Sequence, residues 1–159
     1  MTTSGTAGPA VLRRATRDDL PAIERLLRAA GLPTDGVAEI VAEHPDDFCV
    51  AEVDGAAPAI VAVGGLEVCC HTAVLRSVAV DAAWRGLGVG RELVRQLVCD
   101  AESRGIRALY LLTMTAEHYF PRFGFERVDR SSIPPEIAET VEFKAACPAT
   151  AVAMMRATV

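Results

Sequence analysis

Three glycines at alternating positions are the residues whose spacing points most directly to chemistry. They lie in the segment Arg85-Gly-Leu-Gly-Val-Gly90, between a β-type run that ends at Val80 and an amphipathic helical pattern. Glycine has no Cβ, so a ligand can approach the backbone closely and unusual φ/ψ values cost little. The first amide N–H groups of a helix lack intrahelical partners, and the helix dipole favours an anion beside them. The segment therefore predicts a phosphate cradle at a helix N-terminus.

Two common phosphate-binding motifs do not fit this segment. A P-loop needs Gly-Lys-Ser/Thr, whereas Gly90 is followed by Arg91-Glu92, so no hydroxyl is offered to magnesium. A dinucleotide fingerprint needs G-x-G-x-x-G directly after the first strand, whereas this G-x-G-x-G pattern follows a middle strand. A turn that only packs a helix on a sheet remains as an alternative, but it does not explain three alternating glycines preceded by Arg85.

The elements that position the cradle follow from hydrophobic periodicity. Residues 73–80 predict the strand before it, and apolar residues at helical spacing predict a helix that ends at Gly105. Residues 108–112 form a continuous apolar run, typical of a buried strand. A short helix over 116–123 is expected next, with Thr115 as its N-cap and a bend at Pro121.

The remaining chain predicts further strands and helices around this unit. Thr16 and Asp19 have the form of a capping box, which predicts a helix that ends at Gly31. Asp54-Gly55 predicts a β-hairpin. The order β-α-α-β-β-β-α-β-α-β-β favours a mixed α/β sheet with helices on its faces. The other predicted elements are strands over 10–14, 48–53, 59–68, 125–128 and 149–155, a short helix over 36–43 and a proline-led turn over 133–139.

Length and composition limit the classes of function. The 159 residues suit one domain, which we place at residues 10–159 after a flexible tail at 1–9. A net charge of −5 argues against nucleic acid and anionic membranes as partners. No apolar run reaches the ~18 residues of a spanning helix, and the N-terminus lacks signal-peptide features. Five irregularly spaced cysteines favour reduced thiols and a cytoplasmic location. Adjacent Cys69 and Cys70 would point to opposite faces of a strand, so we expect no metal site.

With these elements in place, the glycine segment and the preceding Arg76-Ser-Val-Ala-Val80 resemble a known cofactor motif. They are similar to the acetyl-CoA-binding motif R/Q-x-x-G-x-G/A of the GNAT superfamily of N-acetyltransferases. That family places a strand, a short helix and a Gly-Phe pair after the motif, matched here by 108–112, 116–123 and Gly124-Phe125. The resemblance spans residues 10–156. It implies the α/β (α+β) GNAT fold, a mixed, mostly antiparallel sheet of about seven strands with helices on both faces.

The resemblance also implies where acetyl-CoA would bind. The amides of residues 85–91 would hold the pyrophosphate, and the backbone of Val78 and Val80 would pair with the pantetheine arm like an added strand. The strands at 75–80 and 108–112 would splay apart, with the thioester between them. The residues implied for cofactor binding are Val78, Ala79, Val80, Arg85, Gly86, Leu87, Gly88, Val89, Gly90, Arg91 and Phe120.

A narrower resemblance concerns the acceptor. Residues 109–117, 133–135, 140–143 and 147–148 are similar to arsenic-resistance N-acetyltransferases and to the acetyltransferase domain of N-acetylglutamate synthase. Both groups acetylate the α-amine of small amino-acid-like acceptors. The segment 31–35 and the lack of an amino-acid-kinase domain favour the arsenic-resistance group, which detoxifies organoarsenical amino acids. Glutamate acetylation is the alternative, and the apolar last strand leaves a homodimer open.

The expected acceptor site contains one arginine and several short polar side chains. An amino acid carries a carboxylate, and a guanidinium fork is its best partner, so we predict that Arg76 holds it. Thr113 and Thr115 follow the next strand, where their hydroxyls could hold the acceptor or the thioester. The residues predicted to bind the acceptor are Arg76, Ser77, Thr113, Thr115 and Glu142.

The sequence departs from the wider family at the catalytic groups. Many members carry an acid where this chain has Arg76-Ser77, and a tyrosine where it has Phe120. Tyr119 is a candidate acid, although one helical residue is about 100° of rotation. Glu67 and Glu142 are candidates for the base that deprotonates the amine. The residues predicted to be catalytic are Glu67, Tyr119 and Thr113. Glu142 is also among the residues predicted to bind the acceptor. The departures also leave open a non-catalytic acyl-CoA-binding regulator.

Overall fold

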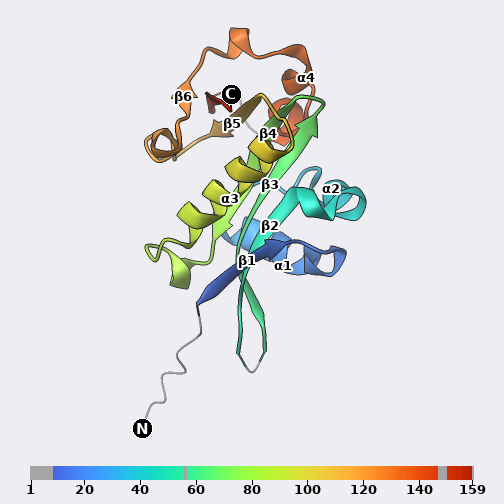
Figure 1. The fold of residues 1–159 in the computed structure, drawn as a ribbon, viewed down its shortest axis with the longest axis vertical. Coiled ribbons are helices and arrows are strands. Elements are labelled where there is room, and N and C mark those ends of the chain that lie inside the picture. The colour runs from blue at the N-terminus through green and yellow to red at the C-terminus, as the bar shows by residue number, and fades with distance from the viewer. Residues whose placement is uncertain (1–8, 56, 147–149, 159) are drawn as a thin grey trace.

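The computed structural model describes residues 9–55, 57–146 and 150–158. A single seven-stranded sheet has the order β1-β2-β3-β4-β5-β7-β6 (Figure 1). Neighbouring strands are antiparallel except for the parallel pair β4–β5, so the predicted mixed, mostly antiparallel sheet is confirmed. The strands are β1 (Ala10–Arg14), β2 (Phe48–Val53), β3 (Ala59–Cys69), β4 (Thr72–Val80), β5 (Ala108–Thr113), β6 (Glu126–Arg127) and β7 (Val152–Ala157). The predicted tail lies outside the described residues except for Pro9.

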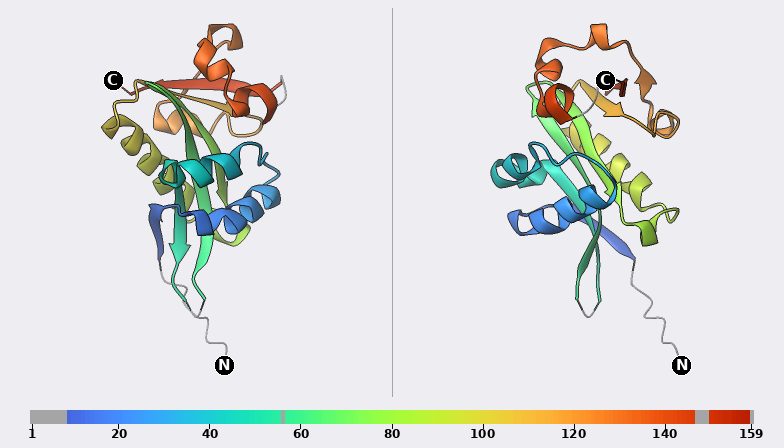
Figure 2. Two further views of the ribbon diagram at one scale, coloured as in Figure 1. Left: turned by 90° about the vertical axis from the view of Figure 1, so that its right-hand side faces the viewer. Right: turned by 180° about the vertical axis from the view of Figure 1, so that it is seen from behind.

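Helices cover both faces of the sheet, as predicted (Figure 2). On one face, α3 buries the stripe that the periodicity predicted, with Leu93, Leu97 and Ala101 at most 1% exposed. On the other face, α1 and α2 pack against β2, β3 and β4. Among the described residues, no helix is long and apolar enough to cross a membrane. The helices are α1 (Leu20–Ala29), α2 (Val37–Glu43), α3 (Val89–Ser103) and α4 (Pro135–Ala138), followed by a π-helical turn (Glu142–Ala146).

The strands β4 and β5 separate where the resemblance implied a splay. They pair only from Thr72 to Val74 against 108–110, whereas β5 continues to pair with β7 as far as Thr113. Within the described chain, the β5-facing edge of β4 from Leu75 to Val80 therefore has no strand partner. Ser77 sits on this edge with φ +60°, an unusual conformation for a side-chain-bearing residue, where the β3–β4 register shifts. The edge is available to an extended ligand.

One local prediction is wrong. Residues 116–123 do not form a helix capped by Thr115, because only a 3-10 turn forms, over Phe120–Phe123. Thr113 takes the capping role instead, since its Oγ1 accepts a hydrogen bond from the amide of Ala116 at 2.9 Å. Pro121 explains the failed helix, because it has no N–H to continue an α-helical ladder.

The last strand is an ordinary member of the sheet. Val152–Ala157 pairs with β5 on one side and with β6 on the other, so β7 is not a free edge. Its predicted start at residue 149 lies outside the described residues, as do residues 147–148 of the narrower resemblance. The predicted capping box is present, but it opens a 3-10 turn over Arg17–Asp19 directly before α1.

Candidate active site

The cradle has the backbone conformation that the glycines suggested. Gly86 and Gly88 have φ of +79° and +85°, and α3 begins at Val89. No acceptor in the described part of the chain receives the amide N–H groups of residues 85–91. A Cβ built on Gly86 or Gly88 would meet no atom within 4 Å, so there is open space beside the backbone at both glycines. An unfilled row of donors at a helix start fits a diphosphate.

Short local contacts fix the entry to the cradle. The Asp81 carboxylate accepts from the amide of Ala83 at 2.9 Å, and the amide of Trp84 donates to the carbonyl of Asp81 at 2.8 Å. The half-buried Trp84 packs against the core beneath α3. The Arg85 guanidinium donates from Nε to the carbonyl of Val80 at 3.3 Å, which fastens the loop to the end of β4.

Three of the predicted acceptor residues, Arg76, Ser77 and Glu142, lie together, and the candidate base Glu67 joins them. The side chain of Arg76 is 0% exposed, and its Nη1 donates to Glu67 Oε1 at 2.9 Å. Its Nη2 donates to the carbonyl of Asp35 and lies 3.4 Å from Glu142 Oε2. Its Nε donates to Ser77 Oγ at 3.1 Å. We call Arg76, Glu67 and Glu142 the arginine cluster.

The arginine cluster has one more negative than positive charge. Glu67 is held on both sides, because its Oε2 also accepts from the amide of Val141 at 3.0 Å. Val141 in turn lies against Gly36, where a built Cβ would be 3.2 Å from its Cγ1. The cluster therefore joins β3, β4, the loop before α2 and the segment before the π-helical turn. Sequence reasoning missed Asp35 as a partner, because a carbonyl contact leaves no mark in the residue type.

The two threonines after β5 have different surroundings. Thr113 is 9% exposed, and its oxygen is already an acceptor in the turn, which leaves its O–H free to donate elsewhere. Thr115 is exposed on the turn that follows. Thr113 is thus the last residue of β5 and is buried, whereas Thr115 caps no helix.

The two adjacent aromatic residues also separate. Phe120 is buried in the core against Phe125, with ring centroids 5.9 Å apart. Tyr119 is half-buried, and its hydroxyl is 3.6 Å from where a Cβ on Gly90 would lie. Burial raises the pKa of Tyr119, opposed by the positive charges of Arg122 and Arg91. A phenol with a raised pKa stays protonated at neutral pH, so Tyr119 offers a proton beside the start of α3.

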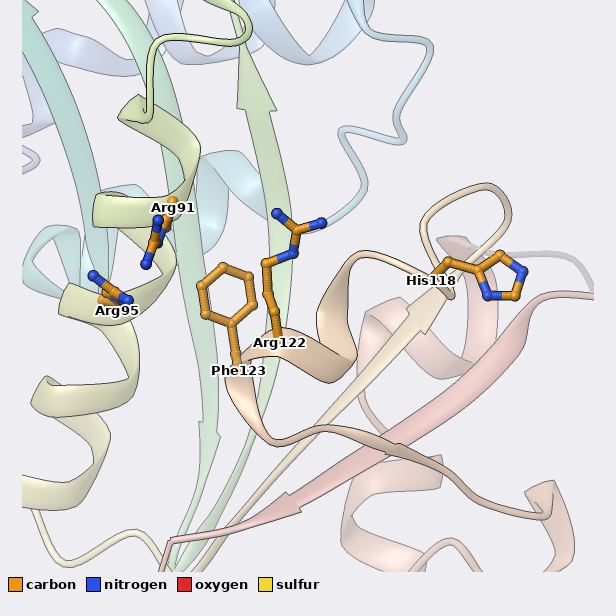
Figure 3. Close-up of a pocket in the computed structure, with 5 residues that line it drawn as sticks. All are labelled: Arg91, Arg95, His118, Arg122 and Phe123. Atoms are coloured by element: carbon orange, nitrogen blue, oxygen red, sulfur yellow. The ribbon is translucent and has the colours of Figure 1, made fainter.

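A basic pocket lies beside the cradle. It has a volume of about 350 Å³ and combines residues of α3 with residues of the 120–123 turn and the loop before it (Figure 3). Among its lining residues, only Arg91 was predicted to bind the cofactor. The lining residues are Arg91, Arg95, His118, Arg122 and Phe123.

Comparisons with known proteins agree with this geometry. The family model described as the acetyltransferase (GNAT) domain matches residues 44–127. An amino-acid acetyltransferase of Mycobacterium tuberculosis is 30% identical over 130 residues, which cover 80% of this chain and 74% of the relative. An uncharacterized N-acetyltransferase of Chlorobaculum tepidum, CT2212, is 28% identical over 134 residues, 82% of this chain and 84% of that protein.

Solved structures share the fold. Rv2747 from Mycobacterium tuberculosis, in complex with CoA and NLQ, superposes with a TM-score of 0.77 at 24% identity, over 92% of this chain and 98% of that one. N-acetylglutamate synthase from Neisseria gonorrhoeae, complexed with coenzyme A and N-acetyl-glutamate, gives a TM-score of 0.78 at 19% identity. That match covers 96% of this chain but only 36% of the synthase.

Proposed function

The chain belongs to the GNAT superfamily of acetyltransferases and uses acetyl-CoA, and from this premise we propose that its acceptor is the α-amine of an amino acid or a close analogue. The observation that carries the proposal is Arg76, a fully buried guanidinium on the strand whose open edge borders the cofactor site. A buried guanidinium at that place suits a carboxylate-bearing acceptor. The amino-acid acetyltransferase among the relatives supports the same class.

In this proposal, the acceptor carboxylate exchanges with Glu142. The contact between Arg76 and Glu142, at 3.4 Å, is longer than the 2.9 Å contact between Arg76 and Glu67. Replacing one carboxylate by another leaves the charge of the arginine cluster unchanged, so the exchange avoids stranding a buried charge. An acceptor without a carboxylate cannot make this exchange.

The chain's residues would then orient two reactants. When bound, acetyl-CoA supplies an acetyl group activated as a thioester. The amides of residues 85–91 hold its pyrophosphate, and the open edge of β4 orients its pantetheine arm. The acceptor amine attacks directly, without a covalent enzyme intermediate. Glu67 and Glu142 are our candidates for the base.

Two further side chains complete the proposed site. Tyr119 is our candidate to protonate the leaving thiolate, because its phenol is neutral at physiological pH. Thr113 is our candidate to orient the acceptor, because its O–H remains able to donate. Thr115 and Ser77 would border the same acceptor, with Ser77 fixed by the Arg76 side chain.

A substrate panel tests the proposal. Acetyl-CoA turnover is measured with free amino acids including glutamate, with their phosphinic and arsinic analogues, and with the matching amino-acid amides. We expect the free acids to be acetylated and the amides to lose most activity. Preference for an arsinic analogue would assign the arsenic-resistance role, which the comparisons do not support, and preference for glutamate would assign the biosynthetic one. Equal rates for acids and amides would overturn the proposal. CoA binding without any turnover would favour the regulator.

A further inference from the structure

The basic pocket concentrates positive charge in a chain whose net charge is −5. Arg91, Arg95 and Arg122 all line it. Within the described residues, the one carboxylate ion-paired with any of the three is Glu92, whose Oε1 lies 3.6 Å from Arg95 Nη1 in an exposed pair. Exposed pairs of this kind contribute little and neutralise the guanidinium weakly. The pocket is therefore a site of uncompensated positive charge.

Contacts with Tyr119 fix the orientation of the Arg122 side chain. Its Nε donates to the carbonyl of Tyr119 at 3.0 Å, and its guanidinium carbon lies 4.4 Å from the centroid of the Tyr119 ring. The ring is itself fixed by edge contacts with Phe120 and Phe123, at 5.4 and 5.3 Å between centroids. Within the described residues, the two terminal nitrogens of Arg122 donate no hydrogen bond. A pre-oriented fork loses less entropy when it binds an anion.

The position of the pocket relates it to the cradle. Arg91 is the last residue of the cradle, and Arg95 follows one helical turn later on the same side of α3. In Figure 3, these two side chains lie on one side of Phe123 and Arg122 on the other, while His118 points away from the group. An anion held between the three arginines would thus lie next to a diphosphate held by the amides.

We infer that Arg91, Arg95 and Arg122 bind the 3′-phosphate of coenzyme A and so make the chain selective for the fully phosphorylated cofactor. The inference rests on acetyl-CoA as the cosubstrate. Coenzyme A carries a pyrophosphate and one phosphate monoester, and the amides of residues 85–91 account for the pyrophosphate alone. A phosphate monoester carries about −1.5 to −2 charge at neutral pH and accepts bidentate hydrogen bonds from guanidinium groups.

Calorimetric binding of CoA and of dephospho-CoA to the full chain tests this inference. Wild type should bind CoA at least tenfold more tightly than dephospho-CoA. Arg95→Met and Arg122→Met should each weaken CoA binding about tenfold, with little change for dephospho-CoA. Arg25→Met, an exposed arginine on α1, is the matched control and should change neither. Melting temperatures check that every variant is folded.

The outcomes separate this inference from the proposed function. Equal affinity of wild type for the two cofactors would overturn the inference while leaving acetyl-CoA as cosubstrate. Arginine variants that weaken both cofactors equally would also overturn it, because that pattern indicates general attraction of anions. Saturable binding of inorganic phosphate, without preference for CoA over dephospho-CoA, would mean a simple anion site. Failure to bind either cofactor would instead contradict the proposed function.

Discussion

Arg76→Met should be the most destabilising substitution of the candidate site. The arginine is the cation between two carboxylates whose side chains are only 16% and 7% exposed. Methionine fills much of the space of the arginine stem but removes the positive charge of Arg76 from beside Glu67 and Glu142. Removing one partner of a buried ion pair costs about 3–5 kcal/mol, because the remaining charge is uncompensated.

This loss is large against the usual stability of a domain of this size. Domains are typically stable by about 5–15 kcal/mol, so the variant would lose about a fifth or more of that free energy. For 150–250 residues, each kcal/mol lowers the melting temperature by about 2–4 °C, so a loss of about 3–5 kcal/mol predicts a fall of about 6–20 °C.

Urea unfolding at pH 8 measures these free energies. Glu142→Gln alone should cost about 1 kcal/mol or less, because Arg76 keeps Glu67 as its partner. In the Arg76→Met background, the same Glu142→Gln change should be stabilising, because it removes one of two buried like charges. Arg25→Met is the exposed control and should stay within about 0.5 kcal/mol of wild type.

Two results would refute this reasoning. A cost below about 1 kcal/mol for Arg76→Met at pH 8 would mean that water or movement relieves the stranded carboxylates. A double variant less stable than Arg76→Met would mean that Glu142 contributes packing instead of charge. Either result would also argue against the proposal that the acceptor carboxylate replaces Glu142 beside Arg76.

Three further substitutions test other parts of the molecule. Gly88→Ala should weaken CoA binding at least tenfold in calorimetry, because φ at this position is +85°. Gly105→Ala is the control, since its φ is +74° at the far end of α3. It should lower the stability by a similar amount and leave CoA binding unchanged. The Arg13 guanidinium lowers the pKa of Asp19, so the pair stabilises the fold above about pH 4 and loses that effect as pH falls further. The melting-temperature difference between wild type and Asp19→Asn should therefore shrink below pH 4, and a constant difference would contradict the ion pair. Tyr119→Phe should lower kcat about 100-fold while the Kd for CoA stays unchanged, and an unchanged kcat would exclude the phenol as the acid.

The backbone elements around the proposed cofactor site could be predicted because they are local in sequence. The cradle, the strand before it and the helix after it occupy one continuous stretch, so glycine spacing and helical periodicity were sufficient. The observed start of α3 at Val89 and the open edge of β4 agree with that prediction. The one local error, at 116–123, arose because Pro121 stops the helix entirely instead of bending it.

The basic pocket shows a different limit. Arg91 and Arg95 read as the solvent-facing side of an amphipathic helix, and Arg122 as part of a short turn. Only the folded chain brings the turn against the start of α3, with Tyr119 between them. Side chains that face water in a helical pattern can therefore still form a binding surface when another element packs beside them.

The acceptor half could not be predicted from the sequence, because its chemistry depends on pairing between distant elements. The residue types at Glu67, Arg76 and Glu142 suggested a base, a clamp and a second acid as separate groups. The structure makes them partners, since Arg76 contacts both carboxylates. Because Arg76 is already paired, an acceptor that binds it must replace one of its carboxylate partners. Only an acceptor with a carboxylate can do so without changing the buried charge around Arg76. The same pairing that holds the fold together would then discriminate amino acids from simple amines.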